Sequence, residues 1–138
     1  MTIRPATAAD YGPVSYLLRA AFGGPNEARL VEALRRDGAM ARELVFAGEH
    51  EVVRAYLALV RMTEPQGWLA LAPVAVAPGS QGLGLGGRLI HAALGVAEAP
   101  VVMYPAATRR SIHSGLRPRY YLFKMALNIP LNLLRMEP

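Results

Sequence analysis

The chain has 138 residues, of which 53% are hydrophobic and 18% are charged. This length and composition are typical of one packed globular domain and exclude an intrinsically disordered protein, so we expect a single domain over residues 1–138. The formal net charge is +5 and cysteine is absent, which excludes disulfides, thiolate metal sites and a cysteine nucleophile.

The basic residues are almost all arginine, and Lys124 is the one lysine. They are dispersed along the chain until a looser group at Arg109, Arg110, Arg117 and Arg119. Proteins that bind the phosphates of nucleic acid usually cluster their basic residues on one surface, and dispersed arginines do not favour this. A positive net charge is also compatible with a polyanionic cofactor. We therefore expect no nucleic-acid partner, and a basic nucleic-acid-binding domain stays as a remote alternative.

Neither a membrane span nor a metal site is expected. The longest uncharged apolar run, Trp68 to Val76, is far shorter than the roughly 20 residues that a membrane-spanning helix needs. The first residues lack the apolar core of a signal peptide, so we expect a cytoplasmic protein without a membrane partner. His50, His91 and His113 lie far apart and have no zinc-site spacing.

The first forty residues predict a strand and two helices. Ile3–Pro5 has the pattern of a short strand, and Thr7 or Asp10 can cap the helix after it. Apolar residues at positions 14, 17, 18, 21 and 22 then form one stripe of an amphipathic helix. A second helix is expected to begin with Asn26 as its cap and to close at Asp37-Gly38. Its predicted inward-facing residues are Leu30, Val31 and Leu34.

The apolar period then changes to that of strands. Leu44–Phe46 and Val52–Val60 flank residues 47–51, which predicts an antiparallel hairpin with a turn near Gly48. Leu69–Val76 is apolar on both faces and predicts a central strand. Because Pro73 cannot donate to a sheet ladder, we expect a bulge or local splay at this residue.

A glycine-rich turn, a helix and another strand follow. The helix is predicted over residues 84–97 and the strand over residues 101–104, which makes one βαβ unit appended to an antiparallel meander. Apolar residues cover more than half of the helix surface, so we expect it to be deeply buried. These residues are Leu85, Leu89, Ile90, Ala93 and Leu94.

The last third of the chain predicts a short helix over residues 108–114, ended by Gly115, and one or two strands over residues 120–129. An apolar strand edge in this region invites pairing with a second copy of the chain. We therefore expect a homodimer.

The glycines of Gln81–Gly87 carry the strongest functional signal. Glycine in a helix costs up to about 1 kcal/mol relative to alanine, but it allows close approach and positive φ, so that several N–H groups converge on one anion. The start of the following helix adds unpaired N–H donors and the positive end of its dipole. The loop therefore predicts a diphosphate site; a merely tight turn, for which one glycine suffices, is the alternative.

Two other phosphate-binding loops do not fit. A nucleoside-triphosphate loop needs Gly-Lys followed by Ser or Thr, and here Gly87 is followed by Arg88-Leu89. Gly82, Gly84 and Gly87 satisfy the dinucleotide pattern G-x-G-x-x-G. That fold should begin with the pattern, however, and no acidic residue ends the following strand to hold a ribose.

The pattern Gln81-x-x-Gly84-x-Gly86, separated from an apolar strand end by four residues, resembles the GNAT superfamily of N-acetyltransferases. The segments Ile3–Asp10 and Leu71–Pro78 are similar to one small bacterial branch of that superfamily, and the likeness covers about residues 1–104. It implies an α/β (α+β) fold with a mixed, mostly antiparallel central sheet and helices on both faces. It also implies direct transfer of acetyl from acetyl-CoA to a primary amine, without a metal.

By this resemblance, the main chain of the strand end would bind the pantetheine arm of the cofactor, and the loop amides from Gly82 to Gly87 would hold its pyrophosphate. Gln81 and Arg88 flank the loop. The predicted cofactor-binding residues are Val74, Ala75, Val76, Gln81, Gly82, Leu83, Gly84, Leu85, Gly86 and Gly87.

No catalytic residue is assigned from the sequence. The family commonly places a tyrosine on its last short helix as the acid for the departing thiolate, and Ser111 stands at that position here. Tyr104 and His113 are substitutes for the acid or base, and Glu64 is a further candidate base. The missing tyrosine leaves a second hypothesis open, a non-catalytic acyl-CoA-binding module. The acceptor amine is not identified.

Overall fold

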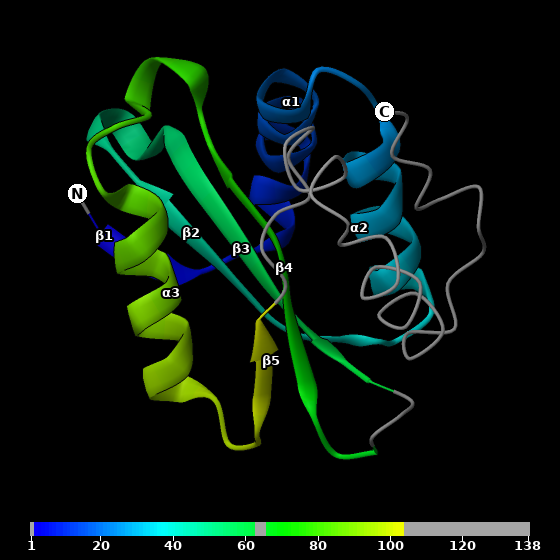
Figure 1. The fold of residues 1–138 in the computed structure, drawn as a ribbon. Helices are drawn as coiled ribbons and strands as arrows, with labels where there is room; N and C mark the ends of the chain where they lie inside the picture. The colour runs from blue at the N-terminus through cyan, green and yellow to red at the C-terminus, as the bar shows by residue number, and fades with distance from the viewer. Residues whose placement is uncertain (1, 63–65, 104–138) are drawn as a thin grey trace, which may run out of the picture.

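A computed structural model describes residues 2–62 and 66–103 of the chain (Figure 1). The elements in chain order are β1 (Thr2–Pro5), the short 3-10 helix η1 (Ala8–Asp10), α1 (Tyr11–Phe22), α2 (Asn26–Arg36), β2 (Met40–Ala47), η2 (Glu49–Glu51), β3 (Val53–Arg61), β4 (Leu69–Val76), η3 (Pro78–Ser80), α3 (Leu85–Val96) and β5 (Val101–Met103). The strands form one sheet in the order β1-β2-β3-β4-β5. Strands β1 to β4 are antiparallel and β5 is parallel to β4, which confirms the mixed sheet and the single βαβ unit.

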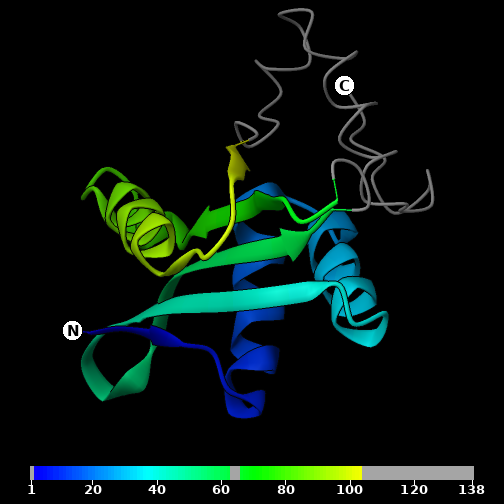
Figure 2. The ribbon, with the colours of Figure 1, turned by 90° about the horizontal axis from the view of Figure 1, so that it is seen from below.

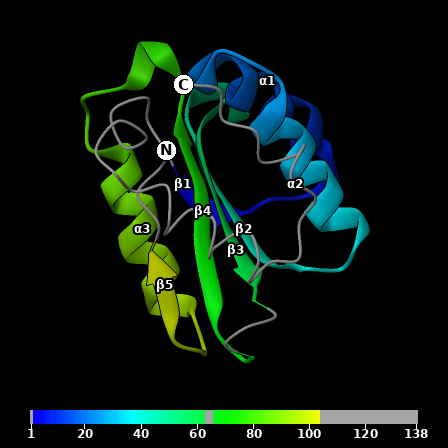
Figure 3. The same ribbon diagram turned by 45° about the vertical axis from the view of Figure 1, so that its right-hand side comes forward.

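The helices lie on both faces of this sheet. Figures 2 and 3 show α1 and α2 against one face and α3 against the other. Each face has its own hydrophobic core. The core under α1 and α2 includes Val14, Leu18, Val31, Val45 and Tyr56. The core under α3 includes Phe46, Leu57, Leu71, Leu85 and Leu89.

Of the predicted α1 stripe, Val14, Leu17 and Leu18 are buried, and Ala21 and Phe22 are partly buried. All three residues predicted to face inward from α2 are buried. The predicted helix cap at Asn26 is wrong. Helix α2 already begins at Asn26, and its N-cap is Pro25. Proline suits the start of a helix, because its ring restricts φ and it has no N–H that needs a partner.

The predicted hairpin is formed by β2 and β3, and β4 has the bounds that the sequence predicted. The predicted bulge is also present. Val74 pairs with Leu57 and Leu71 pairs with Leu59, so two residues of β4, Ala72 and Pro73, lie opposite one residue of β3.

Strand β5 pairs only with the first half of β4. Its three residues pair with Leu69–Leu71, and Figure 1 shows it beside the lower part of β4. The second half of β4, beyond the bulge, pairs with β3 on one side. On its other side, no strand of residues 2–62 or 66–103 pairs with it. Among the described strands, the sheet therefore has an open edge at the end of β4.

The prediction that α3 is deeply buried is wrong for its outer face. Leu89 and Ala93 are fully buried against the sheet, but Leu94 is 45% exposed and Val96 is 41% exposed. Within residues 2–62 and 66–103, only one face of α3 is covered, because the sheet lies against it from one side (Figure 2). Within the described residues, no helix has the length and hydrophobicity to span a membrane. The helix predicted at 108–114, the strands predicted at 120–129 and the proposed dimer edge lie outside the described residues.

Candidate functional site

The open edge of β4 presents main-chain groups that alternate along the strand. The Ala77 N–H donates to the Arg54 carbonyl at 2.8 Å, on the β3 side. Because successive residues of a strand turn their main-chain groups to opposite sides, the N–H and C=O of Val76 and Val74 lie on the open side. These are the two residues whose main chain the sequence predicted to bind an extended ligand.

The start of α3 lies directly beside this edge. A Cβ atom built on Gly86 would lie 3.6 Å from Cγ2 of Val76 and 3.9 Å from Cγ1 of Val74. Helix α3 therefore begins against the side chains of the same two residues whose main chain forms the open edge. The predicted strand end and the predicted loop come together in the structure.

No side chain caps the N–H donors in the first turn of α3. The N-cap is Gly84, which makes no side-chain cap hydrogen bond, and the first turn contains no acidic residue. The first intrahelical bond from this turn runs from the Arg88 N–H to the Gly84 carbonyl at 3.1 Å. The N–H groups that precede Arg88 in the helix have no intrahelical carbonyl within reach, as at every helix start. They form a concentration of positive partial charge.

Gly82 and Gly84 have φ angles of +81° and +78°. Side chains of L-residues rarely adopt this conformation, so glycine is required at both positions to turn the chain into α3. Gly87 is different, because its φ is not positive and a Cβ there would meet no atom of the described residues within 4 Å. The described part of the fold does not need glycine at position 87 and leaves the space beside it open.

Gln81 and Arg88 flank the loop, and both side chains contact other parts of the protein. The Gln81 side-chain amide donates to the Val76 carbonyl at 3.2 Å. The Arg88 guanidinium lies 5.1 Å from the centre of the buried Phe46 ring, within the range of a cation–π contact. Arg88 is exposed and adds a positive charge to the start of α3.

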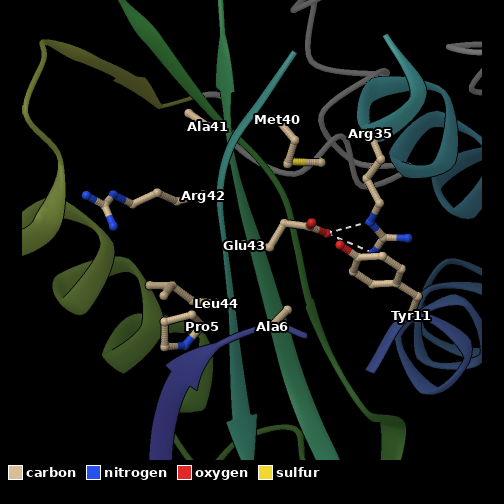
Figure 4. A pocket seen from close by; sticks show the side chains of 9 residues that line it. All are labelled: Pro5, Ala6, Tyr11, Arg35, Met40, Ala41, Arg42, Glu43 and Leu44. Carbon is tan, nitrogen blue, oxygen red and sulfur yellow. Dashed lines mark hydrogen bonds and ion pairs between the residues drawn. The ribbon is translucent and has the colours of Figure 1, made fainter. Parts of the chain in front are cut away.

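A separate polar cluster lies at the far side of the sheet, beyond the end of β1, around a cavity of about 360 Å³ (Figure 4). Glu43 Oε1 accepts hydrogen bonds from Tyr56 Oη at 2.6 Å and from Arg35 Nε at 2.9 Å. The guanidinium of Arg35 also stacks 3.7 Å from the centre of the Tyr11 ring. Arg35 Nη2 lies 2.7 Å from Glu43 Oε1, but the angle does not make a hydrogen bond.

This cluster ties both helices of one layer to two strands, and we interpret it as structural. Burial, and then the charge of Glu43, raises the pKa of Tyr56 well above its ordinary value. Tyr56 therefore stays protonated and acts as a hydrogen-bond donor. No local pattern in the sequence indicates this cluster, because its members are far apart in the chain and belong to four different elements.

Glu27 is a second feature that the sequence did not indicate. It lies half-buried in the first turn of α2, and burial raises the pKa of its carboxyl. We assign it no role in the site. Among the described residues, no group of three or more His, Cys, Asp or Glu side chains is arranged to hold a metal ion. The candidate acid–base residues Glu64, Tyr104 and His113 lie outside the described part of the chain, and so does Ser111, which stands at the position of the family's tyrosine.

Two known structures are similar to this chain. A GNAT-family acetyltransferase from Brucella melitensis, in complex with acetyl-CoA, is 29% identical with a TM-score of 0.70 and aligns over 83% of this chain and 80% of that chain. The GNAT-family N-acetyltransferase YhbS from Escherichia coli, in complex with CoA, is 28% identical with a TM-score of 0.70 and aligns over 86% of this chain and 71% of that chain. No curated protein sequence matches the chain significantly.

A family model described as the acetyltransferase (GNAT) family matches residues 13–110. This range begins within the first turn of α1 and includes the open strand edge, the glycine loop and α3. The match spans well over half of the sequence, and the chain therefore belongs to the GNAT family of acetyltransferases.

Proposed function

We propose that this chain binds acetyl-CoA and transfers the acetyl group directly to a primary amine of a small molecule or a protein. One observation carries the proposal: the open edge of β4 lies side by side with a helix start whose N–H donors no side chain caps. An extended amide chain ending in a diphosphate matches this pair of features. The two similar structures that contain acetyl-CoA or CoA support the choice of ligand.

The pantetheine arm would add to the sheet along Val74–Val76 as a strand would, since amides in an extended chain pair with the main-chain groups of an open strand edge. The N–H groups of Gly82–Gly87 would bind the pyrophosphate, because a helix start favours anions. Arg88 adds charge beside it. This proposal keeps the cofactor-binding residues that the sequence predicted.

In the proposed reaction, the neutral amine nitrogen attacks the thioester carbon, and the carbon–sulfur bond then breaks to release CoA. The amine has an ordinary pKa near about 10.4, so it must lose a proton before the attack. The tetrahedral intermediate carries its negative charge on oxygen and needs a hydrogen-bond donor. A main-chain N–H of the open strand edge is our candidate for that donor. The thiolate takes up a proton as it leaves, and we assign no residue to either proton transfer.

Two measurements test the function. Isothermal titration with acetyl-CoA is expected to give saturable binding at one site per chain. A thiol-release assay over a panel of primary amines, including polyamines, amino acids and peptides, is expected to show turnover with at least one acceptor. Absence of CoA binding would reject the proposal, and binding without turnover on any amine would favour a non-catalytic acyl-CoA-binding module.

We further propose that residues 1–138 act as a single domain in the cytoplasm, without a nucleic-acid or membrane partner, and assemble as a homodimer. Dispersed arginines support the absence of a nucleic-acid partner. Light scattering of the purified chain tests the dimer, and a monomeric mass at micromolar concentration would exclude it. Filter binding to DNA and RNA tests the other point, and tight, salt-sensitive retention would contradict it.

A further inference from the structure

The last peptide unit of β4, between Val76 and Ala77, is held from both sides. On the β3 side, the Ala77 N–H donates to the Arg54 carbonyl at 2.8 Å. On the open side, the Val76 carbonyl accepts a hydrogen bond from Gln81 Nε2 at 3.2 Å. Because the N–H and the C=O of one peptide unit lie in one plane, these two bonds fix the orientation of that plane.

The bond from Gln81 changes what the open edge offers to a ligand. Without it, the edge would present the N–H and C=O groups of both Val74 and Val76. With one lone pair of the Val76 carbonyl engaged, the edge groups that have no partner among the described residues are the Val74 N–H, the Val74 C=O and the Val76 N–H. Along the strand, these groups are a donor (the Val74 N–H), an acceptor (the Val74 C=O) and a second donor (the Val76 N–H).

We infer that Gln81 is a positioning residue, which engages the Val76 carbonyl and so fixes where along β4 the amide groups of the pantetheine arm bind. The inference rests on the proposed binding of CoA. Gln81 lies five residues after Val76, at the entry of the glycine loop, so the same bond also fixes where the loop leaves the strand. The strand register and the diphosphate site are thereby coupled through one side chain.

A direct contact between Gln81 and a phosphate is the competing role, and a ligand without phosphates separates the two. S-acetylpantetheine carries the amides and the thioester of acetyl-CoA but no phosphate. A positioning residue affects the affinity for both ligands by a similar factor. A residue that contacts phosphate affects the affinity for acetyl-CoA alone.

The test compares the wild-type chain with Gln81→Met, which has nearly the same shape but no N–H donor. We expect the affinity for acetyl-CoA, measured by isothermal titration, to fall about three- to tenfold, as for loss of one exposed hydrogen bond. The affinity for S-acetylpantetheine, measured by NMR titration of the ¹⁵N-labelled protein, should fall by a similar factor. In the free protein, the carbonyl ¹³C resonance of Val76 should shift, because its hydrogen bond is lost.

Gln81→Arg is the rescue variant, since its side chain again carries N–H donors of sufficient reach. It should restore the Val76 carbonyl resonance and the affinity for S-acetylpantetheine, an uncharged ligand on which the added positive charge has little effect. Should Gln81→Met fail to fold, Gln81→Ala is used in the same comparison.

The outcomes are distinguishable. If the wild-type chain does not bind acetyl-CoA, the proposed function itself fails. If the wild type binds and Gln81→Met keeps its affinity for both ligands, the positioning role alone is overturned. A loss confined to acetyl-CoA also overturns it, and assigns Gln81 to the phosphates instead.

Discussion

Two helix starts in this protein treat their main-chain N–H groups in opposite ways. The start of the short 3-10 helix η1 is closed by a capping box of Thr7 and Asp10, whereas α1 itself makes no side-chain cap hydrogen bond. The Thr7 N–H donates to Asp10 Oδ2 at 2.8 Å, and Arg4 holds both oxygens of the same carboxylate at 2.7 and 3.0 Å. The start of α3 has a glycine as its N-cap, no side-chain cap and no acidic residue.

The difference shows that polar side chains stabilise one of these helix starts and not the other. The Asp10 carboxylate is only 8% exposed, and its bonds to Arg4 and Thr7 serve the fold. At α3, any side chain able to cap the helix would compete with an incoming anion. Leaving that start uncapped forgoes roughly 0.5–2 kcal/mol of helix stability and keeps a site for a diphosphate.

The largest expected effect, on the affinity for acetyl-CoA, comes from placing an acidic side chain at the uncapped start of α3, which we call the open start. Gly87→Asp places a carboxylate where a side chain meets nothing within 4 Å. Like charges about 4 Å apart repel by about 4 kcal/mol at an effective dielectric of 20, and screening by solvent reduces this. We expect the affinity for acetyl-CoA in isothermal titration to fall about a hundredfold. The melting temperature should not fall, because an acidic residue in the first turn suits the helix dipole.

Gly87→Asn is the matched control, since asparagine has the same size and no charge. Its loss of affinity should be much smaller. Equal affinities for the Asp and Asn variants would mean that no anion binds near position 87, and the contrast between the two helix starts would then have no functional meaning.

The second effect concerns another closed region, the cluster of Arg35, Glu43 and Tyr56. Arg35→Met removes the cation and leaves a carboxylate that is 9% exposed without its charge partner. Breaking a buried pair in this way costs about 3 kcal/mol or more. We expect urea unfolding to show that loss, with the affinity for acetyl-CoA unchanged in the folded protein.

The double variant Arg35→Met with Glu43→Gln should recover part of the stability, because it removes the unpaired charge as well. If the single variant is as stable as the wild type, solvent must reach Glu43, and the cluster is not a closed region.

The third effect is a pH dependence at the closed start. Hydrogen bonds from Arg4 hold the pKa of Asp10 at about 2, below its ordinary value of 3.8. Because the folded pKa is lower than the unfolded one, the ionised carboxylate stabilises the fold above about pH 4, and this contribution is lost as the pH falls towards 2. Asp10→Asn should therefore be less stable than the wild type by about 1–2 kcal/mol at pH 7. The difference should disappear near pH 2 in urea titrations, and a difference independent of pH would contradict the assignment.

The smallest effects compare two glycines of the open start. Gly84→Ala places a side chain at a φ of +78° and should lower the stability by about 1 kcal/mol. Gly87→Ala should raise it by about 0.5–1 kcal/mol, because alanine favours the helix. If a ligand occupies the open space, Gly87→Ala nevertheless weakens acetyl-CoA binding. Thermal melts measure the stability of both variants, and isothermal titrations measure their affinity for acetyl-CoA. Unchanged affinity of Gly87→Ala would show that the ligand does not occupy the space beside residue 87.

Local patterns in the sequence were sufficient to predict most of the described fold. The bounds of β4 follow from a continuous apolar run that ends at Ala77-Pro78, and its bulge follows from Pro73, which has no N–H. The glycine loop was predicted because a positive φ leaves a direct mark on the sequence, as Gly82 and Gly84 show.

The errors have a common cause, which is that local patterns contain no information about distant partners. The apolar residues of α3 suggested burial all round, yet Leu94 and Val96 have no described element above them to pack against. The partners of Glu43 lie 8 and 13 positions away in sequence, on another helix and another strand, and no periodicity marks them. The bond from Gln81 to the Val76 carbonyl likewise became visible only in three dimensions, and the predicted contact of Gln81 with the cofactor stays a prediction.

The shortness of the open edge has a consequence for association between chains. Unpaired strand edges are templates that any extended polypeptide can join, and proteins avoid long ones for that reason. Here the free groups span only Val74 to Val76, between the bulge and the carbonyl engaged by Gln81. Such a span gives a foreign strand too few hydrogen bonds for a lasting hold, but it suffices for a slender ligand that is anchored elsewhere by its charge. The same few residues thus admit a cofactor and discourage aggregation.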